Sequence, residues 1–167
     1  YSQIKDFHYI ALRYFNAVGY AADGSIRGKE KNPQNLLPLV MEVATGKREI
    51  LHVFGNDYDT PDGTCIRDYI HVEDLAAAHV LAIKKLLDGG DSQVINLGTE
   101  KGTSVLEIIK SVERVSGKKI NYDFAPRRAG DPANVIATSA KAAKVLGWKA
   151  KYTNIDEIVK TVWSLEK

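Results

Sequence analysis

Arg67 and Arg128 are the residues of this sequence best suited to chemistry, because each stands in a polar stretch that could face a ligand. Arg67 belongs to FGNDYDTPDGTCIRDYIHVEDL, residues 54–75, and Arg128 to residues 125–134. Residues 54–69 are predicted to form a loop, and loops this long within a compact domain tend to bind something rather than merely connect elements. Two guanidinium groups on separate loops could clamp a diphosphate through charge-assisted hydrogen bonds.

The same arginines also allow an interpretation without a ligand. Arg67 precedes Asp68 and Arg128 is close to Asp131, so both could form ordinary surface ion pairs. Such exposed pairs contribute little to stability. The sequence alone leaves the ligand clamp and the surface ion pairs open.

The composition favours a local anion site over a polyanionic partner. The chain has 167 residues, with 23 basic and 21 acidic side chains and a formal net charge of +2. No global field therefore favours nucleic acid or an anionic membrane. The lysine pairs are scattered and lack interleaved aromatic residues, which gives nucleic-acid binding no support. The four histidines show no metal-ligand spacing, so we expect no metal site.

The cysteine content and the hydropathy predict a cytoplasmic protein. The single cysteine, Cys65, excludes an internal disulfide framework. We find no secretory leader and no apolar segment long enough for a membrane helix, and expect no membrane partner.

Two apolar runs predict an α/β fold built on a parallel sheet. Residues 8–15 and residues 94–97 have the near-continuous apolar character of strands that are buried on both faces. Such strands normally need several βαβ neighbours, which this sequence does not obviously supply. We therefore expect one truncated domain, residues 1–167, with two strands left over from an incomplete Rossmann-type sheet.

Helical periodicity and shorter strands fill the rest of the chain. Helices are predicted from Asn35 to residue 46, from residue 72 to 87, from residue 104 to 117, from residue 139 to 146 and from residue 154 to 165. Ser104 and Glu107 form a capping-box signature. Strands are predicted over residues 50–54 and 119–124. One side of the helix over residues 72–87 carries Leu75, Ala76, His79, Val80, Ile83 and Leu87.

Several strings in the sequence resemble the UDP-glucose 4-epimerase family of extended short-chain dehydrogenase/reductases. They are LRYFNAVG over residues 12–19, VFGNDYDTPDGTCIRDYIHVEDLAAAH over residues 53–79, INLGT over residues 95–99, APRRAGDPA over residues 125–133, and Asn35-Leu36 ahead of Leu37-Pro38. The resemblance covers nearly the whole chain. It matches only the carboxyl-terminal half of the family, which grips the nucleotide sugar.

The resemblance implies roles for individual residues in binding a UDP-hexose. Arg67 and Arg128 would contact the pyrophosphate, Asp131 the uridine ribose, and Phe54 the uracil. Other nucleotide-sugar contacts would come from Asn16, Asn35, Leu36, Tyr69 and Val105. By the same resemblance, Tyr14 and Phe15 lie beside the nicotinamide of NAD. On pattern alone, Tyr14 and Phe15 are core residues and Asn35 is a helix cap, and these alternatives stay open.

The chain lacks the motifs that would complete such an enzyme. No GxGxxG occurs, so the phosphate-binding turn of a dinucleotide site is missing. Tyr1 and Lys5 match the spacing of the family's Tyr-x-x-x-Lys pair, but they are too close to the following strand to be that pair. The resemblance thus implies an NAD-dependent isomerase that is a homodimer when intact. We expect this chain to hold no catalytic residue, to bind no NAD alone and to be inactive alone.

Two questions remain open at the level of sequence. The position that faces the sugar is Asn134 or Val135, and either is smaller than the tyrosine of relatives restricted to glucose and galactose, so the resemblance predicts tolerance of N-acetylhexosamines. The alternatives to an epimerase half are a non-enzymatic nucleotide-sugar binding module and half of a related NAD-dependent dehydratase or decarboxylase.

Overall fold

The structure is a computed structural model that describes residues 7–29 and 31–166, so the Tyr1 and Lys5 pair lies outside the described residues. Its strands are β1 (Ile10–Arg13), β2 (Asn16–Val18), β3 (Leu51–Phe54), β4 (Ile66–His71), β5 (Gln93–Asn96), β6 (Gly102–Ser104), β7 (Tyr122–Ala125) and β8 (Asn134–Val135). Its helices are α1 (Leu36–Ala44), α2 (Val72–Leu87), α3 (Val105–Ser116), α4 (Ala140–Leu146) and α5 (Ile155–Trp163).

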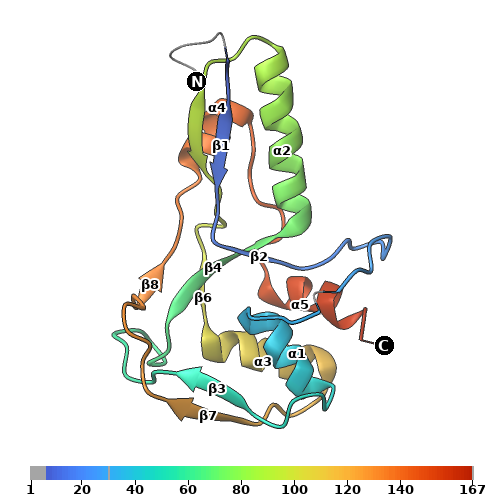
Figure 1. Cartoon of the computed structure of the whole chain (residues 1–167), viewed down its shortest axis with the longest axis vertical. Coiled ribbons are helices and arrows are strands. Elements are labelled where there is room, and N and C mark those ends of the chain that lie inside the picture. Colours follow the sequence, from blue (N-terminus) through green and yellow to red (C-terminus); the bar gives the residue numbers. More distant parts are fainter. Residues whose placement is uncertain (1–6, 30, 167) are drawn as a thin grey trace.

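The strands form three small sheets, and β4 connects the two ends of the molecule (Figure 1). β1 pairs in parallel with β5, and β3 pairs in parallel with β7. β4 pairs with β2 and β8 in parallel and with β6 in antiparallel. In Figure 1, β4 runs from the end that contains β3, β7, α1 and α3 to the end that contains α2 and β1.

The predicted α/β class and the assignment of the two apolar runs to a parallel sheet are confirmed, and the structure shows in addition that the two strands pair with each other. The run over residues 8–15 contains β1, and the run over residues 94–97 overlaps β5. Both strands are shorter than the runs, and β1 is followed directly by β2, which sequence patterning missed. With only one neighbour each in the described residues, β1 and β5 form a two-stranded sheet rather than a full Rossmann sheet.

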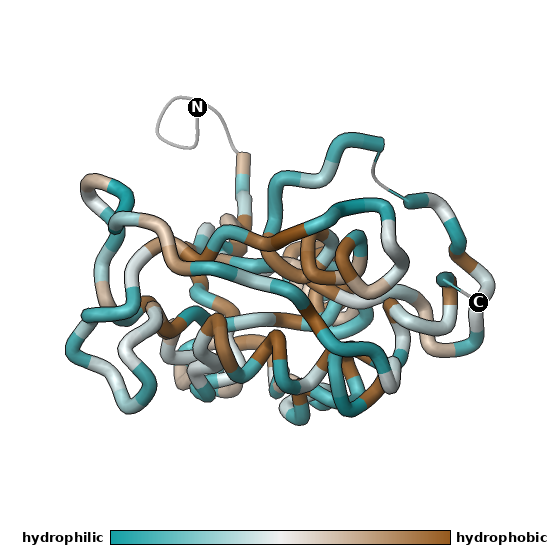
Figure 2. The backbone as a smooth tube through the Cα atoms, turned by 90° about the horizontal axis from the view of Figure 1, so that it is seen from below, coloured by the Kyte–Doolittle hydropathy of each residue, from teal (hydrophilic) through white to brown (hydrophobic). Residues whose placement is uncertain are grey.

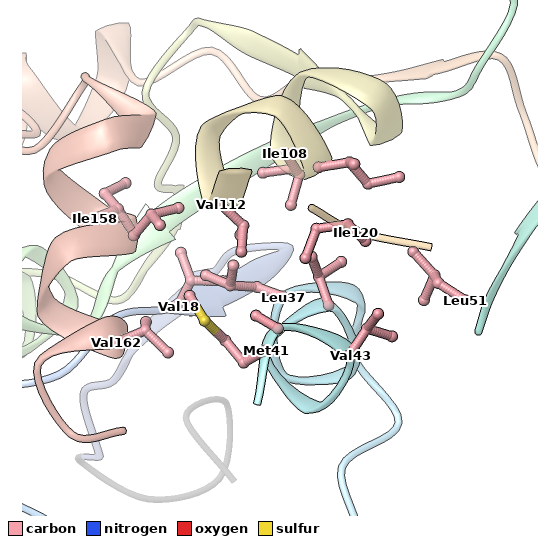
Figure 3. Packing of buried hydrophobic residues seen from close by; sticks show 14 of the residues in the cluster. Val18, Leu37, Met41, Val43, Leu51, Ile108, Val112, Ile120, Ile158 and Val162 are labelled. Atoms are coloured by element: carbon pink, nitrogen blue, oxygen red, sulfur yellow. The ribbon is translucent and has the colours of Figure 1, made fainter. Parts of the chain in front are cut away.

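A first hydrophobic core joins α1, α3 and α5 (Figure 3). Each helix contributes apolar side chains at helical spacing, and Figure 3 shows them pointing toward one another: Leu37 and Met41 from α1, Ile108 and Val112 from α3, and Ile158 and Val162 from α5. The capping box predicted for α3 is confirmed, because the Ser104 hydroxyl accepts from the Glu107 amide and the Glu107 carboxylate accepts from the Ser104 amide. This core supports the elements that line the pocket described below.

A second core packs α2 and α4 around β5. Trp148 is 2% exposed in this cluster, and its indole Nε1 donates to the carbonyl of Asp74 at 2.9 Å. The carboxylate of Asp74, itself buried, accepts from the amides of Lys151 and Tyr152 at 3.0 Å each. The segment after α4 is therefore fixed to the first turn of α2. Figure 2 shows the apolar stretches gathered inside the trace and hydrophilic stretches in its outer loops.

β4 corrects the prediction that residues 54–69 form a loop. Residues 66–71, IRDYIH, form a strand, so Arg67 and Tyr69 are held in extended backbone rather than in a loop. Alternation along the strand turns Arg67 and Tyr69 to the face that lines the pocket described below, and Asp68 and Ile70 to the other face, where Ile70 packs in the second core. The turn predicted at residues 60–63 is present, since the Gly63 amide donates to the Thr60 carbonyl at 3.2 Å.

The side of α2 that the sequence marks as apolar is largely exposed. Val80, Ile83 and Leu87 are 51%, 58% and 81% exposed, whereas Ala78 and Ala82 lie buried against the second core. Small side chains allow close approach of the helix to β1 and β4, which periodicity alone does not indicate. Among the described residues, no helix combines the length and the apolar character that crossing a membrane requires.

Candidate functional site

A surface pocket brings together nine of the residues predicted to contact a nucleotide sugar, and leaves out the predicted sugar-size position. They come from β2, the start of α1, β3, β4, the start of α3 and the segment after β7, and they are Asn16, Asn35, Leu36, Phe54, Arg67, Tyr69, Val105, Arg128 and Asp131. Residues separated by more than a hundred positions in the chain thus line one cavity. This convergence supports the ligand interpretation of the arginines over two unrelated surface contacts.

Arg67 is fixed by the backbone around it while part of its guanidinium stays available. Nη1 donates to the carbonyl oxygens of Ile66 at 2.9 Å and of Pro132 at 2.8 Å. Nη2 lies 3.4 Å from a carboxylate oxygen of Asp131. Nε and the second Nη2 hydrogen have no acceptor within the part of the chain that the structure describes. A side chain that is only 16% exposed and already oriented is suited to bind an anion.

Arg128 stacks on the ring of Phe54, and both residues line the pocket. Its guanidinium carbon lies 3.9 Å from the centroid of the Phe54 ring, within cation–π range. Stacking uses the flat face of the guanidinium and leaves its in-plane N–H groups free to donate. Arg67 and Arg128 together with Asp131 give the pocket a local excess of positive charge.

The structure pairs Arg67 with Asp131 and not with its neighbour Asp68, which the surface ion-pair interpretation had offered as the partner. Asp68 is 2% exposed and accepts from Thr99 and Ala137, so it does not pair with the neighbouring Arg67. Side chains adjacent along a strand point to opposite faces, which is the physical reason. Arg128 and Asp131 are joined by a backbone hydrogen bond, from the Asp131 amide to the Arg128 carbonyl at 3.3 Å.

Asn16 and Tyr69 are placed by the pairing of β2 with β4. The Asn16 side-chain amide donates to the Asp68 carbonyl at 3.0 Å, and Asn16 is in register with Tyr69. Burial raises the pKa of the Tyr69 phenol, which is therefore neutral near pH 7. Asn35 occupies the N-cap position of α1, but its side chain makes no capping hydrogen bond. Asn35 therefore holds the predicted cap position, while its side-chain amide is not used for capping.

The segment between β3 and β4 is ordered by polar contacts around Asp62. One carboxylate oxygen of Asp62 accepts from the Thr64 amide at 2.9 Å and from the Thr64 hydroxyl at 2.7 Å, and the other accepts from the Ser104 hydroxyl. Burial alone would raise the pKa of Asp62, but the hydrogen bonds from Ser104 and Thr64 bring it below its usual value. The segment enters β4 from a fixed position and so helps place Arg67.

Gly55, at the start of this segment, can only be glycine. It has φ +85°, and a Cβ there would lie 2.6 Å from the Tyr58 ring and 2.7 Å from Arg127 Cγ. Both the backbone conformation and the lack of space exclude a side chain. The sequence FGN therefore forms a tight turn at the end of β3, directly after Phe54.

Tyr14, Phe15, Asn134 and Val135 do not line this pocket. Tyr14 and Phe15 follow the carboxyl end of β1 and are 40% and 53% exposed, so the alternative that they are core residues is wrong. Asn134 and Val135 form β8 and pair with Ile66 and Arg67 of β4. Ligands of parallel sheets bind beyond the carboxyl ends of strands, and Tyr14 and Phe15 are at such a position.

Sequence reasoning missed part of the pocket lining, namely Gln34, Leu39, Leu51, His52, Val53 and Cys65. Most of these flank predicted residues on α1, β3 or β4, and their proximity in sequence was the only available signal. His52 Nδ1 lies 2.6 Å from a carboxylate oxygen of Asp123 on β7, a pairing that only the β3–β7 register reveals. Burial raises the pKa of the Cys65 thiol, so it is not an activated nucleophile. No cluster of three or more His, Cys, Asp or Glu side chains suited to a metal occurs among the described residues.

The fold is that of part of a short-chain dehydrogenase/reductase. Residues 1–162 match the sequence model of the family described as GDP-mannose 4,6 dehydratase. The chain belongs to this family.

UDP-glucose 4-epimerases are among the similar proteins, which confirms the resemblance found in the sequence. The UDP-glucose 4-epimerase of Lacticaseibacillus casei is 47% identical over 93% of this chain and 47% of its own length. A crystal structure of UDP-glucose 4-epimerase superposes with a TM-score of 0.94 at 48% identity, covering 98% of this chain and 50% of that one. The Bifidobacterium longum enzyme in complex with NAD+ and UDP gives a TM-score of 0.83 at 46% identity, covering 96% and 47%. The chain spans about half the length of the relatives it matches.

Proposed function

We propose that this chain is the carboxyl-terminal part of an NAD-dependent epimerase that interconverts UDP-glucose and UDP-galactose at carbon 4. Residues 1–167 would act as one UDP-sugar-binding domain. The observation that carries the proposal is the convergence of Arg67, Arg128 and Asp131 with Phe54 in one pocket. Relatives 44–51% identical to the chain are UDP-glucose 4-epimerases, which supports the choice of reaction.

Each part of a UDP-sugar has a chemical partner in the pocket. The free N–H groups of Arg67 and Arg128 would donate to the diphosphate oxygens. The carboxylate of Asp131 would accept hydrogen bonds from ribose hydroxyls, and Phe54 would pack against the uracil. Asn16, with its amide held on the Asp68 carbonyl, presents its side-chain oxygen as an acceptor.

The chain's own residues do not make a complete NAD site. The sequence has no glycine-rich phosphate-binding turn, and the candidate contacts to the nicotinamide are the exposed rings of Tyr14 and Phe15. The chemistry that NAD would supply in the intact enzyme is removal of a hydride from carbon 4 of the hexose and its return to the opposite face. This chain's part is to hold the nucleotide firmly while the hexose turns over as a 4-keto sugar, so that binding energy from UDP retains the intermediate.

A dehydratase or decarboxylase is the second candidate, because the matching family model is described as GDP-mannose 4,6 dehydratase. A structure named MoeE5, in complex with UDP-glucuronic acid and NAD, is also a relative, but at 28% identity. The products separate these reactions, since an epimerase yields only the two hexose epimers. A non-enzymatic binding module is the third candidate and predicts that no catalytic partner exists.

The binding part of the proposal is tested by calorimetry of the purified chain with UDP and UDP-glucose. We expect saturable binding of both, with most of the affinity present in UDP alone. The same chain, incubated with NAD+ and UDP-glucose and followed by proton NMR, should form no UDP-galactose. Interconversion by the chain alone would disprove its inactivity, and a failure to bind UDP would disprove the binding function.

The size of the sugar site gives a prediction for the intact enzyme. By the resemblance, Asn134 or Val135 faces the sugar, although neither lines the pocket described above. Because both are smaller than tyrosine, we expect an intact enzyme that contains this chain to epimerise UDP-N-acetylglucosamine as well as UDP-glucose. Turnover of the two substrates, compared by NMR, measures this directly. Turnover of UDP-glucose with none of UDP-N-acetylglucosamine would show that neither residue sets the size limit.

A further inference from the structure

Asp68 is a buried carboxylate in the middle of β4, directly between the pocket residues Arg67 and Tyr69. It is 2% exposed and turned away from the pocket. Oδ1 accepts from the Thr99 amide at 3.0 Å and from the Thr99 hydroxyl at 2.6 Å. Oδ2 accepts from the Ala137 amide at 3.2 Å. A carboxylate this deeply buried would be costly without these donors.

The residues that donate to Asp68 lie in two segments next to the pocket or the β1–β5 sheet. Thr99 follows the carboxyl end of β5, which is where ligands of parallel sheets bind. Ala137 follows β8, and the segment before β8 carries Arg128 and Asp131. Asp68 therefore links the strand that carries Arg67 to the segment that carries the rest of the anion-binding residues and to the end of the β1–β5 sheet.

Other contacts between β4 and the segment over residues 131–137 lie nearer the surface. The Ile66 amide donates to the Ala133 carbonyl at 2.8 Å, and Arg67 bonds the Pro132 carbonyl at 2.8 Å. Of these contacts between β4 and residues 131–137, the hydrogen bond from the Ala137 amide to Asp68 is the buried one. Gly98 packs closely against this hydrogen bond, because a Cβ at Gly98 would lie 2.6 Å from Asp68 Oδ2 and 2.5 Å from the Ala137 carbonyl oxygen.

We infer that Asp68 is a positioning residue, which fixes the segment over residues 131–137 and the turn at residues 98–99 against β4 and so pre-organises the pocket. It touches no ligand itself. A segment already held in place loses less conformational entropy on binding, so its release lowers affinity. The effect on ligand binding rests on the proposed function, whereas the effect on the two segments does not.

Asp68→Asn provides the test, with Asp74→Asn as the matched control. Asp74 is equally buried, 2% exposed, and its two oxygens also accept backbone amides, but those belong to Lys151 and Tyr152, which do not line the pocket. In either variant an NH₂ group replaces one side-chain oxygen and faces an amide donor. The loss in the free energy of unfolding is therefore expected to be similar for the two variants. Thr99→Val is a milder third variant that keeps the Thr99 amide donor to Asp68 and removes the hydroxyl donor, together with the contacts of that hydroxyl with Lys101.

Amide hydrogen exchange and calorimetry with UDP are the two measurements. Asp68→Asn should speed exchange in residues 98–99 and 126–137 and raise the UDP dissociation constant about tenfold, with Thr99→Val in the same direction but smaller. Asp74→Asn should speed exchange only near residues 148–152 and leave the UDP dissociation constant within about twofold of wild type.

The outcomes separate this inference from the proposed function. Unchanged exchange over residues 126–137 in folded Asp68→Asn, or in Thr99→Val if Asp68→Asn does not fold, overturns the inference. Faster exchange there with UDP affinity equal to that of Asp74→Asn reduces Asp68 to a structural residue and also overturns it. If the wild-type chain does not bind UDP, the proposed function fails, and the exchange comparison alone decides whether Asp68 holds the two segments.

Discussion

Replacing Arg67 with alanine is expected to weaken UDP binding by about 1.5–3 kcal/mol, the usual range for a hydrogen bond to a charged group. The reason lies in how Arg67 is held. Its Nη1 bonds to the Ile66 and Pro132 carbonyls fix the guanidinium before any ligand arrives. Alanine removes the N–H donors and, with them, a side chain that is already oriented for the ligand. Calorimetry with UDP at constant ionic strength measures the loss.

Arg127→Ala is the matched control, because it removes the same side chain one residue before Arg128. Arg127 bonds to Asp57 at 2.6 Å, stacks on Tyr58 at 4.1 Å, and does not line the pocket. We expect its UDP affinity to remain near wild type. Equal affinities of the two variants for UDP, with both chains folded, would return Arg67 to a structural role.

Arg67→Lys separates charge from geometry at the same position. Lysine keeps the positive charge but loses the planar arrangement of N–H groups that bonds two backbone carbonyls and a diphosphate at once. We expect an affinity between those of wild type and Arg67→Ala. A loss as large as that of alanine would assign the whole effect to the guanidinium geometry.

The pocket residues with a proposed ligand contact could be predicted from the sequence, but the strand that carries Arg67 and Tyr69 could not. The strings around Arg67 and Arg128 identify the family, and the family assigns the contacts. The strand β4, in contrast, has the sequence IRDYIH, which shows little of the apolar character of a buried strand. Asp68 is buried through its bonds to Thr99 and Ala137, and these partners lie 31 and 69 positions away.

Dependence on partners distant in sequence also explains why the sequence did not predict the short strands and the buried side of α2. β2, β6 and β8 have two or three residues each, so their existence depends on pairing with β4 and not on local propensity. α2 was placed correctly, but its buried side was not. Periodicity finds an apolar stripe, whereas the structure buries the side on which Ala78 and Ala82 permit close packing.

Replacing Trp148 with alanine is expected to destabilise the fold by about 3–5 kcal/mol, the usual cost of truncating a buried large aromatic residue. Trp148 is 2% exposed between α2 and α4, and alanine would leave a cavity in the second core. It would also remove the indole donor from the Asp74 carbonyl. Because whole domains are stable by only about 5–15 kcal/mol, this one change removes a large part of the total.

Trp163→Ala is the control for Trp148→Ala, since these are the only tryptophans of the chain. Trp163 is partly buried at the edge of the first core, so its truncation should cost less. Each variant keeps one tryptophan, and urea unfolding followed by fluorescence gives both free energies of unfolding. If Trp148→Ala lowers the free energy of unfolding no more than Trp163→Ala does, Trp148 is not a major stabilising residue of the second core. The second core does not line the pocket, so Trp148→Ala that is still folded should bind UDP as wild type does.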